Sequence, residues 1–441
     1  MSEYQYSITN SYTYFVREIR KCTPFTQVPV VLSNSHGQPG FGNEWGLSIS
    51  RQGDYLLHSW LRVTFPEVVL LDTNPHGEHG RIRWTRNLMH NLIKDVTISF
   101  SEIQTQRLNN YYLDFWAAFT CAAGKRAGYD SMIGNVDDLI APHPPGEPLK
   151  EKTLNLPLPF FFTRDTGLAL PTAALPYNDI KYYFTFRNWQ ELLILETNDP
   201  IPNARNGGTP QVGASISIAP VLTNVNAWCN YAIISAPERI HMGSCARDIL
   251  IEQGQLNPPQ TYEPVNNPNK CYDLRFSHGI KAIFFGIRNS TYNNVWSNYT
   301  SASPVINDRQ IMFEPAGAAD PISAVDLRYD SAMRFSNLGS DYFSHINPWY
   351  HAPSIPEPIG YHMYSYALDL MSVDPMGSTN FGRLNNVGFV PHASDAARVG
   401  SNGTGPIGSG MDFPQIYNFI CFAINTNILT IVGGVVGFPV M

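Results

Sequence analysis

The sequence predicts an all-β protein with sandwich or barrel packing and a few inserted helices, divided into two domains. Two features predict this class: apolar and polar residues alternate with a period of two along many short segments, and 34 prolines and 33 glycines separate those segments. Long stretches of helical periodicity are scarce. The 441 residues suffice for two β domains of about 200 residues each.

Four segments carry the strand pattern most clearly. In residues 61–65, 96–101 and 181–187, apolar side chains occupy every second position, so each segment is expected to form a half-buried strand. Residues 280–287, IKAIFFGI, are apolar at nearly every position. That pattern is typical of a strand that is covered on both faces.

A proline-rich segment, residues 154–171, reads LNLPLPFFFTRDTGLALP. Pro157 and Pro159 remove N–H donors from one side of the chain, which predicts an edge strand or a strand-to-loop transition. The three rings of Phe160 to Phe162 need cover from two layers. Residues 165–167, DTG, favour a turn, since Asp bonds its own downstream backbone and Gly tolerates positive φ. Arg164 and Asp165 are therefore expected to be a turn anchor or an ion pair rather than a catalytic pair.

One longer helix and several connections are also predicted. Apolar residues at 112, 115, 116 and 119 have helical spacing, and the preceding Asn109-Asn110 can cap that helix. A connector between the domains is expected over residues 237–246. Loops are expected over residues 142–152, 255–270 and 401–410. The apolar residues 427–441 are too few for a membrane helix and contain Gly433-Gly434, so they predict a buried final strand plus a tail.

The composition favours a protein whose surface is largely covered by other subunits. Hydrophobic residues make up 43% of the chain and charged residues only 15%, against about 25% in ordinary soluble domains. The net charge is −7, and no run of Lys or Arg could follow a phosphate backbone. Direct nucleic-acid binding is therefore disfavoured.

The first 20 residues lack an apolar segment of the secretory type, so no signal peptide is expected there. The six cysteines, at 22, 121, 229, 245, 271 and 421, are too widely spaced for a zinc ribbon or a CxxC redox motif. We expect reduced, mostly buried thiols in an intracellular setting, although sequence spacing leaves disulfides open.

Several short motifs suggest chemistry but are better explained otherwise. GTGPIG, residues 403–408, lacks a following helix and so is not expected to bind a dinucleotide. His76 and His79 lie in a glycine-rich loop with no third metal ligand nearby. Glu44 and Asp54 flank a strand and could be offered as a glycosidase carboxylate pair, but acidic residues at strand ends usually serve turns or ion pairs. Sequons at Asn289, Asn298 and Asn402 are expected to be unused.

Long blocks of the sequence resemble the major capsid proteins of iridoviruses, within the nucleocytoplasmic large DNA viruses. The resemblance is carried in the first part of the chain by residues 41–63 (FGNEWGLSISRQGDYLLHSWLRV), 81–93 (RIRWTRNLMHNLI) and 157–179 (PLPFFFTRDTGLALPTAALPYND). In the second part it is carried by residues 347–370 (NPWYHAPSIPEPIGYHMYSYALDL), 374–387 (DPMGSTNFGRLNNV) and the closing VGFPVM. The blocks extend from about Tyr14 to the C-terminus.

The resemblance implies a double jelly roll, with two consecutive eight-stranded sandwiches in one chain. The expected division is an N-terminal arm over residues 1–22, shorter than is usual in the family, a first jelly roll over 23–243 and a second over 244–441. The family is structural, so no catalytic, cofactor-binding or metal-binding residues are implied.

The resemblance also implies an assembly. Three copies are expected to form a homotrimeric, pseudo-hexagonal capsomer that tiles the icosahedral shell of the virion, assembled in the host cytoplasm. The expected partners are neighbouring trimers, minor capsid and penton proteins, and an internal viral membrane close to the shell, with no direct nucleic-acid contact.

Two other functions remain as alternatives. A transient scaffold with the same fold would shape membranes during assembly and would be absent from the mature particle. A carbohydrate-binding or carbohydrate-active β-sandwich would need an aromatic platform or paired carboxylates such as Glu44 and Asp54.

Overall fold

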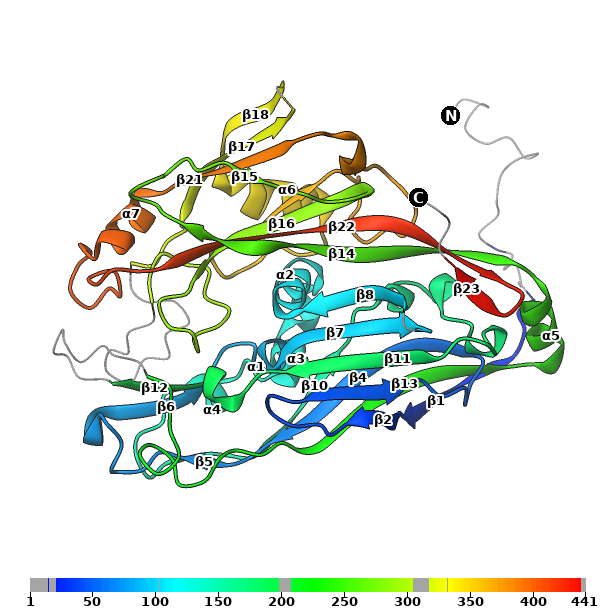
Figure 1. The fold of residues 1–441 in the computed structure, drawn as a ribbon, viewed down its shortest axis with the longest axis horizontal. Helices are drawn as coiled ribbons and strands as arrows, with labels where there is room; N and C mark the ends of the chain where they lie inside the picture. Colours follow the sequence, from blue (N-terminus) through cyan, green and yellow to red (C-terminus); the bar gives the residue numbers. More distant parts are fainter. Residues whose placement is uncertain are drawn as a thin grey trace.

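The computed structural model describes residues 15, 21–101, 103–197, 208–303, 317–330 and 332–437. These residues form two β-sandwiches that lie side by side (Figure 1). The first half comprises β1 to β13, residues 25–234, and the second half comprises β14 to β23, residues 247–437. Helix α5 (Ala236–Ser244) joins them.

The first half contains two main antiparallel sheets. One has the order β1 (Phe25–Val31), β13 (Thr223–Ile234), β4 (Tyr55–Phe65), β10 (Lys152–Pro157). The other has the order β2 (Ser33–Gly37), β3 (Glu44–Ser48), β11 (Ile180–Phe186), β7 (Ile93–Phe100), β8 (Ile103–Asn109). Two short pairs complete it: β12 (Leu193–Thr197) with β6 (Gly80–Trp84), and β5 (Val68–Val69) with β9 (Pro148–Leu149).

The second half repeats this plan. One sheet has the order β14 (Arg247–Tyr262), β22 (Tyr417–Val432), β16 (Gly279–Asn289), β19 (His362–Ser365), with β20 (Thr379–Asn380) on β16 and β23 (Val435–Gly437) on β22. The facing sheet has the order β15 (Tyr272–Asp273), β21 (Val387–Ala393), β17 (Ile322–Tyr329), β18 (Ala332–Gly339). The fold is therefore the predicted double sandwich of two jelly rolls.

Short helices are inserted between the strands. They are α1 (Leu88–Leu92), α2 (Asn110–Thr120), α3 (Ala123–Ile133), α4 (Asp137–Ile140), α6 (Asn347–His351) and α7 (Asp395–Asn402). A π-helical turn, Tyr342–Ile346, precedes α6. The predicted helix after Asn109 is α2, and the Asn109 side chain accepts a hydrogen bond from the backbone N–H of Tyr112 at 2.8 Å. No helix among the described residues is both long and apolar enough to span a membrane.

The predicted strands are confirmed, and the structure explains why residues 280–287 are apolar throughout. These residues lie in β16, where Ile283, Phe285 and Ile287 pack into the core between the two sheets of the second half. Ala282 and Phe284 point the other way, into a larger core shared with the first half. The strand is thus covered on both faces because the two sandwiches pack against each other through it.

The proline-rich segment behaves as predicted at its start and differs further on. Strand β10 ends at Pro157 and pairs only with β4, at the edge of its sheet. The three phenylalanines are fully buried, but the chain there forms a tight 3-10 turn, Phe161–Thr163, instead of continuing as a strand. Asp165 then caps the predicted turn, since its carboxylate accepts from the N–H of Gly167 at 3.0 Å.

One predicted loop is wrong. Residues 255–262 of the Pro-rich segment belong to β14, a 16-residue strand. The strand tolerates Pro258 and Pro259 because it lies at a sheet edge and its pairing with β22 shifts register between Asn257 and Gln260. The predicted connector over residues 237–246 is mostly helical, as α5.

The predicted C-terminal strand is confirmed as the end of β22, followed by a turn and β23. Gly433 and Gly434 have φ of +60° and +83°, which suits the tight turn of a hairpin and which residues with a Cβ adopt rarely. The last four residues of the predicted tail lie outside the described residues.

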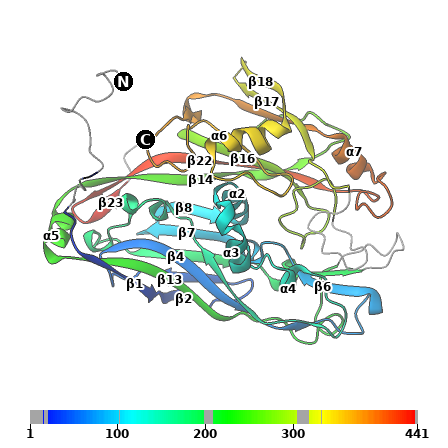
Figure 2. The ribbon, with the colours of Figure 1, turned by 180° about the vertical axis from the view of Figure 1, so that it is seen from behind.

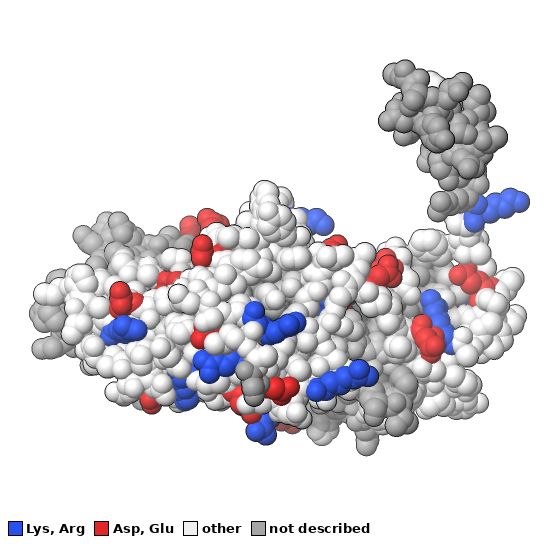
Figure 3. All heavy atoms as spheres, turned by 90° about the horizontal axis from the view of Figure 1, so that it is seen from above, with Lys and Arg blue, Asp and Glu red and all other residues white. Residues whose placement is uncertain are grey.

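Charged side chains are interspersed on the surface. On the face that Figure 3 shows, blue and red residues lie singly or in small mixed groups among uncharged ones. This face carries no concentrated basic area of the kind that binds a phosphate backbone.

Candidate functional site at the junction of the two halves

Helix α2 forms the junction between the two halves. It lies between the sheets of the first half and the sheet that contains β14, β16 and β22 (Figures 1 and 2). Every residue from Asn110 to Phe119 is buried. The Phe115 ring lies 4.8 Å from Tyr361 and 5.7 Å from Phe422, centroid to centroid, and both partners belong to the second half. Aromatic pairs of this kind stabilise beyond the area they bury.

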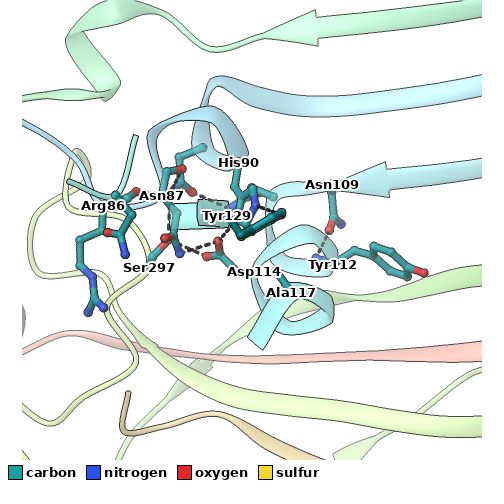
Figure 4. A network of polar contacts seen from close by, with 12 residues as sticks. Arg86, Asn87, His90, Asn109, Tyr112, Asp114, Ala117, Tyr129 and Ser297 are labelled. Carbon is teal, nitrogen blue, oxygen red and sulfur yellow. Dashed lines mark hydrogen bonds and ion pairs between the residues drawn. The ribbon is translucent and has the colours of Figure 1, made fainter. Parts of the chain in front are cut away.

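A buried carboxylate sits in the middle of this apolar junction. The side chain of Asp114, on α2, is completely buried and accepts four hydrogen bonds (Figure 4). Oδ1 accepts from Asn87 Nδ2 at 3.0 Å and from His90 Nδ1 at 2.7 Å. Oδ2 accepts from Ser297 Oγ at 2.5 Å and from Tyr299 OH at 3.0 Å. The first two donors belong to the first half and the last two to the second, so one carboxylate joins both.

The protonation of this network follows from its geometry. An ionised carboxylate only accepts, so His90 donates from Nδ1, and its Nε2 lies 2.7 Å from the hydroxyl of Tyr129. Burial, reinforced by the charge of Asp114, raises the pKa of Tyr129 and that of Tyr299 far above the ordinary tyrosine value. Both phenols therefore stay protonated, and Tyr299 donates to Asp114.

Ser297, His90 and Asp114 are the residue types of a hydrolase triad. Their hydrogen bonds, however, connect them in a way that does not activate the serine as a nucleophile. A nucleophilic serine donates to the imidazole that takes its proton. Here the Ser297 hydroxyl donates to Asp114, and the imidazole donates to the other oxygen of the same carboxylate. The group holds two segments together.

Two residues of the network adopt backbone conformations that cost energy. Asn87, with φ of +47°, precedes α1, and Ser297, with φ of +55°, lies in the loop after β16. Left-handed conformations of this kind persist where surrounding contacts enforce them. Both residues donate to Asp114, which is consistent with the carboxylate holding the two backbone segments in place.

A second polar contact between the halves involves Arg164. Its guanidinium donates to Glu252 Oε2 at 2.6 Å and lies 3.5 Å from the centroid of the Trp116 ring. Lys281 Nζ donates to Glu252 Oε1 at 2.5 Å. All three charged side chains are buried, and Glu252 and Lys281 belong to the second half. The ion-pair prediction for Arg164 is thus confirmed within one chain.

A third contact joins Trp296 of the second half to Arg187 and Glu191 of the first, while Arg288, the other arginine on its ring, belongs to the second half. The guanidinium carbons of Arg187 and Arg288 lie 3.8 and 3.6 Å from the centroid of its ring. Its indole N–H donates to the carbonyl of Glu191 at 2.9 Å. Burial lowers the pKa of Arg187. Contact with an aromatic face stabilises such a desolvated cation.

The sequence-predicted carboxylate pair is not brought together. Glu44 is exposed at the start of β3, in the five-stranded sheet. Asp54 is buried immediately before β4, a strand of the other sheet, and it accepts from Arg239 of α5 at 2.6 Å and from the backbone N–H of Ile234 at 2.9 Å. Asp54 therefore anchors the connection between the halves.

The remaining motifs also have structural explanations. His79 lies 3.6 Å from the neighbouring Glu78, and within the described part of the chain no three His, Cys, Asp or Glu residues could share a metal ion. GTGPIG follows a helix instead of opening one: Gly403 is the left-handed C-cap of α7. A Cβ at Gly403 would lie 2.7 Å from the backbone of Phe413, so glycine is required there.

The sequons and the cysteines differ in exposure. Asn289 and Asn298 are buried, and each side chain accepts from the threonine of its own sequon, whereas Asn402 is exposed. All six thiols are free. The expectation of mostly buried cysteines is wrong, because Cys22, Cys245 and Cys271 are exposed in connections outside the strands, and only Cys229 and Cys421, inside strands, are buried.

Sequence reasoning missed the Asp114 network. One signal was present: Asp114 is the only charged residue in the otherwise apolar and amide-rich helix NYYLDFWAAFT. A charge inside a buried helix requires partners. Those partners come from positions up to 185 residues away, which local periodicity does not report.

Two jelly rolls in one chain, packed through a common core and joined by buried polar contacts, make up a double jelly roll. Two family models match the chain: the major capsid protein N-terminus over residues 13–234, and the large eukaryotic DNA virus major capsid protein over residues 238–437. The chain belongs to the major capsid proteins of large eukaryotic DNA viruses. It is a structural protein and not an enzyme, so the carbohydrate-active alternative is wrong.

The relatives agree with this family. The chain is 54% identical to the major capsid protein of Invertebrate iridescent virus 6 over 449 aligned positions, covering 100% of this chain and 96% of the relative. It is 43% identical to that of Lymphocystis disease virus 1 (isolate Darai), covering 100% and 95%. Among solved structures, the PBCV-1 virus capsid matches with a TM-score of 0.74 at 21% identity, covering 97% of this chain and 100% of that chain. The iridovirus resemblance is thus confirmed.

Proposed function

We propose that three copies of the chain form a homotrimeric capsomer with a pseudo-hexagonal outline and that these capsomers tile the icosahedral shell. The observation that carries the proposal is the pairing of two similar sandwiches in one chain of the major capsid family. Three chains around a threefold axis present six sandwiches. Six similar units around one axis approximate a hexagon, the shape that tiles a flat face.

The junction supports this role. A tile must keep its two halves in a fixed relation, and a shared apolar core with buried polar contacts fixes that relation. We propose the domain division at α5, with the arm over residues 1–22, the first jelly roll over 23–243 and the second over 244–441. We propose further that the chain carries no catalytic, metal or cofactor site.

The proposed setting is the outer shell of a virion assembled in the host cytoplasm. The proposed partners are neighbouring capsomers, minor capsid and penton proteins and a nearby internal membrane. Nucleic acid is excluded from this set because the net charge is −7 and basic residues are dispersed.

Electron microscopy of the purified full-length protein tests the proposal. Class averages should show particles with threefold symmetry and a hexagonal outline. Elongated particles with a single pair of sandwiches would contradict it. Mass spectrometry of purified virions separates the shell from the scaffold alternative: the shell predicts this chain as an abundant virion component, and a scaffold predicts its absence.

A further inference from the structure

Exposed apolar side chains concentrate around α6. Trp349 and Tyr350 on this helix are 72% and 73% exposed, and Leu368 beside them is 72% exposed. Further exposed apolar residues lie in the same stretch: Ile346, Ile355, Ile359, Met371 and Met376. Clusters of this kind on a soluble protein mark interaction surfaces, and Trp and Tyr are enriched at their energetic centres.

The backbone holds this cluster in place. Asn347, at the start of α6, is buried and accepts from the backbone N–H of Ser365 at 3.0 Å. The carbonyl of His351, at its end, accepts from the N–H of Leu370 at 2.9 Å, and His351 Nδ1 lies 3.0 Å from the carbonyl of Leu368. A surface that is already ordered loses less entropy when a partner binds.

The stretch of chain that carries the cluster has charged side chains of one sign. Residues 335–382 contain no Lys or Arg but contain Asp341, Glu357, Asp369 and Asp374. A partner surface of complementary potential is therefore neutral or basic around an apolar centre.

The same chain offers such a surface. An apolar pocket of about 360 Å³ lies between α2, α3 and the end of β10. Its lining includes Leu113, Trp116, Tyr129, Pro157 and Pro159. Lys125 is exposed on α3, the helix that contributes Tyr129 to the pocket, and it forms no ion pair within the described part of the chain. The pocket thus combines an apolar interior with a nearby positive charge.

Helices α3 and α6 lie on the same side of the molecule (Figure 2). The segment after α6 also contacts α2, since the N–H of Ser354 donates to the carbonyl of Phe119 at 3.1 Å. In a cyclic trimer each copy uses two different surfaces, one for each neighbour. The cluster around α6 and the pocket beside α3 are two such surfaces, and they can meet between neighbouring copies when their side of the chain faces the threefold axis.

We propose that Trp349 and Tyr350 of one copy pack into the pocket between α2 and α3 of the next copy around the threefold axis. The inference rests on the proposed trimer and names the contact that forms it. Each copy contributes one aromatic pair and one pocket, so three identical contacts close the ring.

Disulfide trapping tests this contact, because Cys121 lines the pocket and is partly exposed. In a background with Cys22→Ser, Cys245→Ser and Cys271→Ser, Trp349→Cys should form covalent dimers and trimers on non-reducing gels after oxidation. Adding Cys121→Ser should abolish them. Ile407→Cys, at a position near α7 that is at least as exposed as Trp349, should stay monomeric on the gel. Mild alkali assists, since burial raises the pKa of Cys121.

The outcomes separate the contact from the trimer. A sample that is trimeric by light scattering but gives no Cys121-dependent cross-link, or only a link within one chain, overturns the inference and leaves the proposed function standing. A sample that is monomeric at all concentrations overturns both. Independently, Trp349→Ala should weaken trimer association at least tenfold, as loss of an aromatic centre does, while Ile407→Ala should leave it unchanged.

Discussion

At the residue scale, the Arg164-Asp165 dipeptide divides two tasks between neighbouring side chains. Arg164 reaches across to Glu252 in the second half, and Asp165 caps a local turn. The sequence predicted a turn anchor or an ion pair, and both occur. The turn was predictable because it depends on residues two positions apart. Glu252 was not, because it lies 88 residues further along the chain.

Glu252→Gln should destabilise the protein strongly. The change leaves Arg164 and Lys281 buried as like charges without a counter-ion, which costs about 3–5 kcal/mol. Asp165→Ala is the matched control and should cost about 1 kcal/mol, because it removes only one exposed capping bond. Thermal unfolding of both variants measures the difference. Equal melting temperatures would show that the buried ion pairs of Glu252 contribute nothing to the stability of the protein.

Asp114→Asn should loosen the junction. In the native protein each oxygen of Asp114 accepts from two donors. Asparagine keeps one of these oxygens and has an N–H₂ group in place of the other, so two buried hydrogen bonds are lost, at about 1–3 kcal/mol each. Amides of residues 295–300 should then exchange hydrogen faster. Tyr129→Phe removes only the bond to His90 and should affect them less. Unchanged exchange in Asp114→Asn would contradict the role given to this carboxylate.

At the scale of elements, strand alternation predicted β4, β7, β11 and β16, and helical spacing with an Asn cap predicted α2. The pattern failed at β14, where two prolines suggested a loop and the chain forms a strand. The strand propensity of proline reflects its own backbone alone. The sheet tolerates Pro258 and Pro259 because β14 lies at its edge and its pairing with β22 shifts register there. Position in a sheet is a tertiary property and is not visible in local sequence.

Gly434→Ala should destabilise the C-terminal hairpin by at least 1 kcal/mol. The residue has φ of +83°, and an added Cβ would lie 3.0 Å from Pro176 and from Tyr177. Gly128→Ala, in the middle of α3 with open space beyond its Cα, should instead stabilise by about 0.5–1 kcal/mol. Melting temperatures of the two variants should move in opposite directions, and a shift of the same sign in both would contradict this.

At the scale of the whole molecule, the cores bury many tyrosines, and this predicts sensitivity to alkali. Burial raises the pKa of Tyr112 to about 12 and raises the pKa of Tyr182, Tyr231, Tyr262 and Tyr417 as well. A raised folded-state pKa means that stability is complete below the unfolded value of 10.0 and falls as the pH rises above it.

Each such tyrosine lowers the free energy of unfolding by about 1.4 kcal/mol for every pH unit between its pKa in the unfolded state and its pKa in the folded state. Tyrosinate absorbance and circular dichroism, followed together against pH, should therefore show the buried tyrosines ionising in one cooperative step with unfolding above pH 10. Gradual ionisation with an unchanged fold would contradict the burial described here.

The central claim is that a double jelly roll of this family assembles as a trimer. Light scattering of the purified full-length chain over a wide dilution range tests it most directly. The account predicts a constant mass of three times 49.3 kDa, about 148 kDa, because obligate interfaces bury more than about 2,000 Å² and do not dissociate on dilution. A mass of 49.3 kDa throughout the range would contradict it.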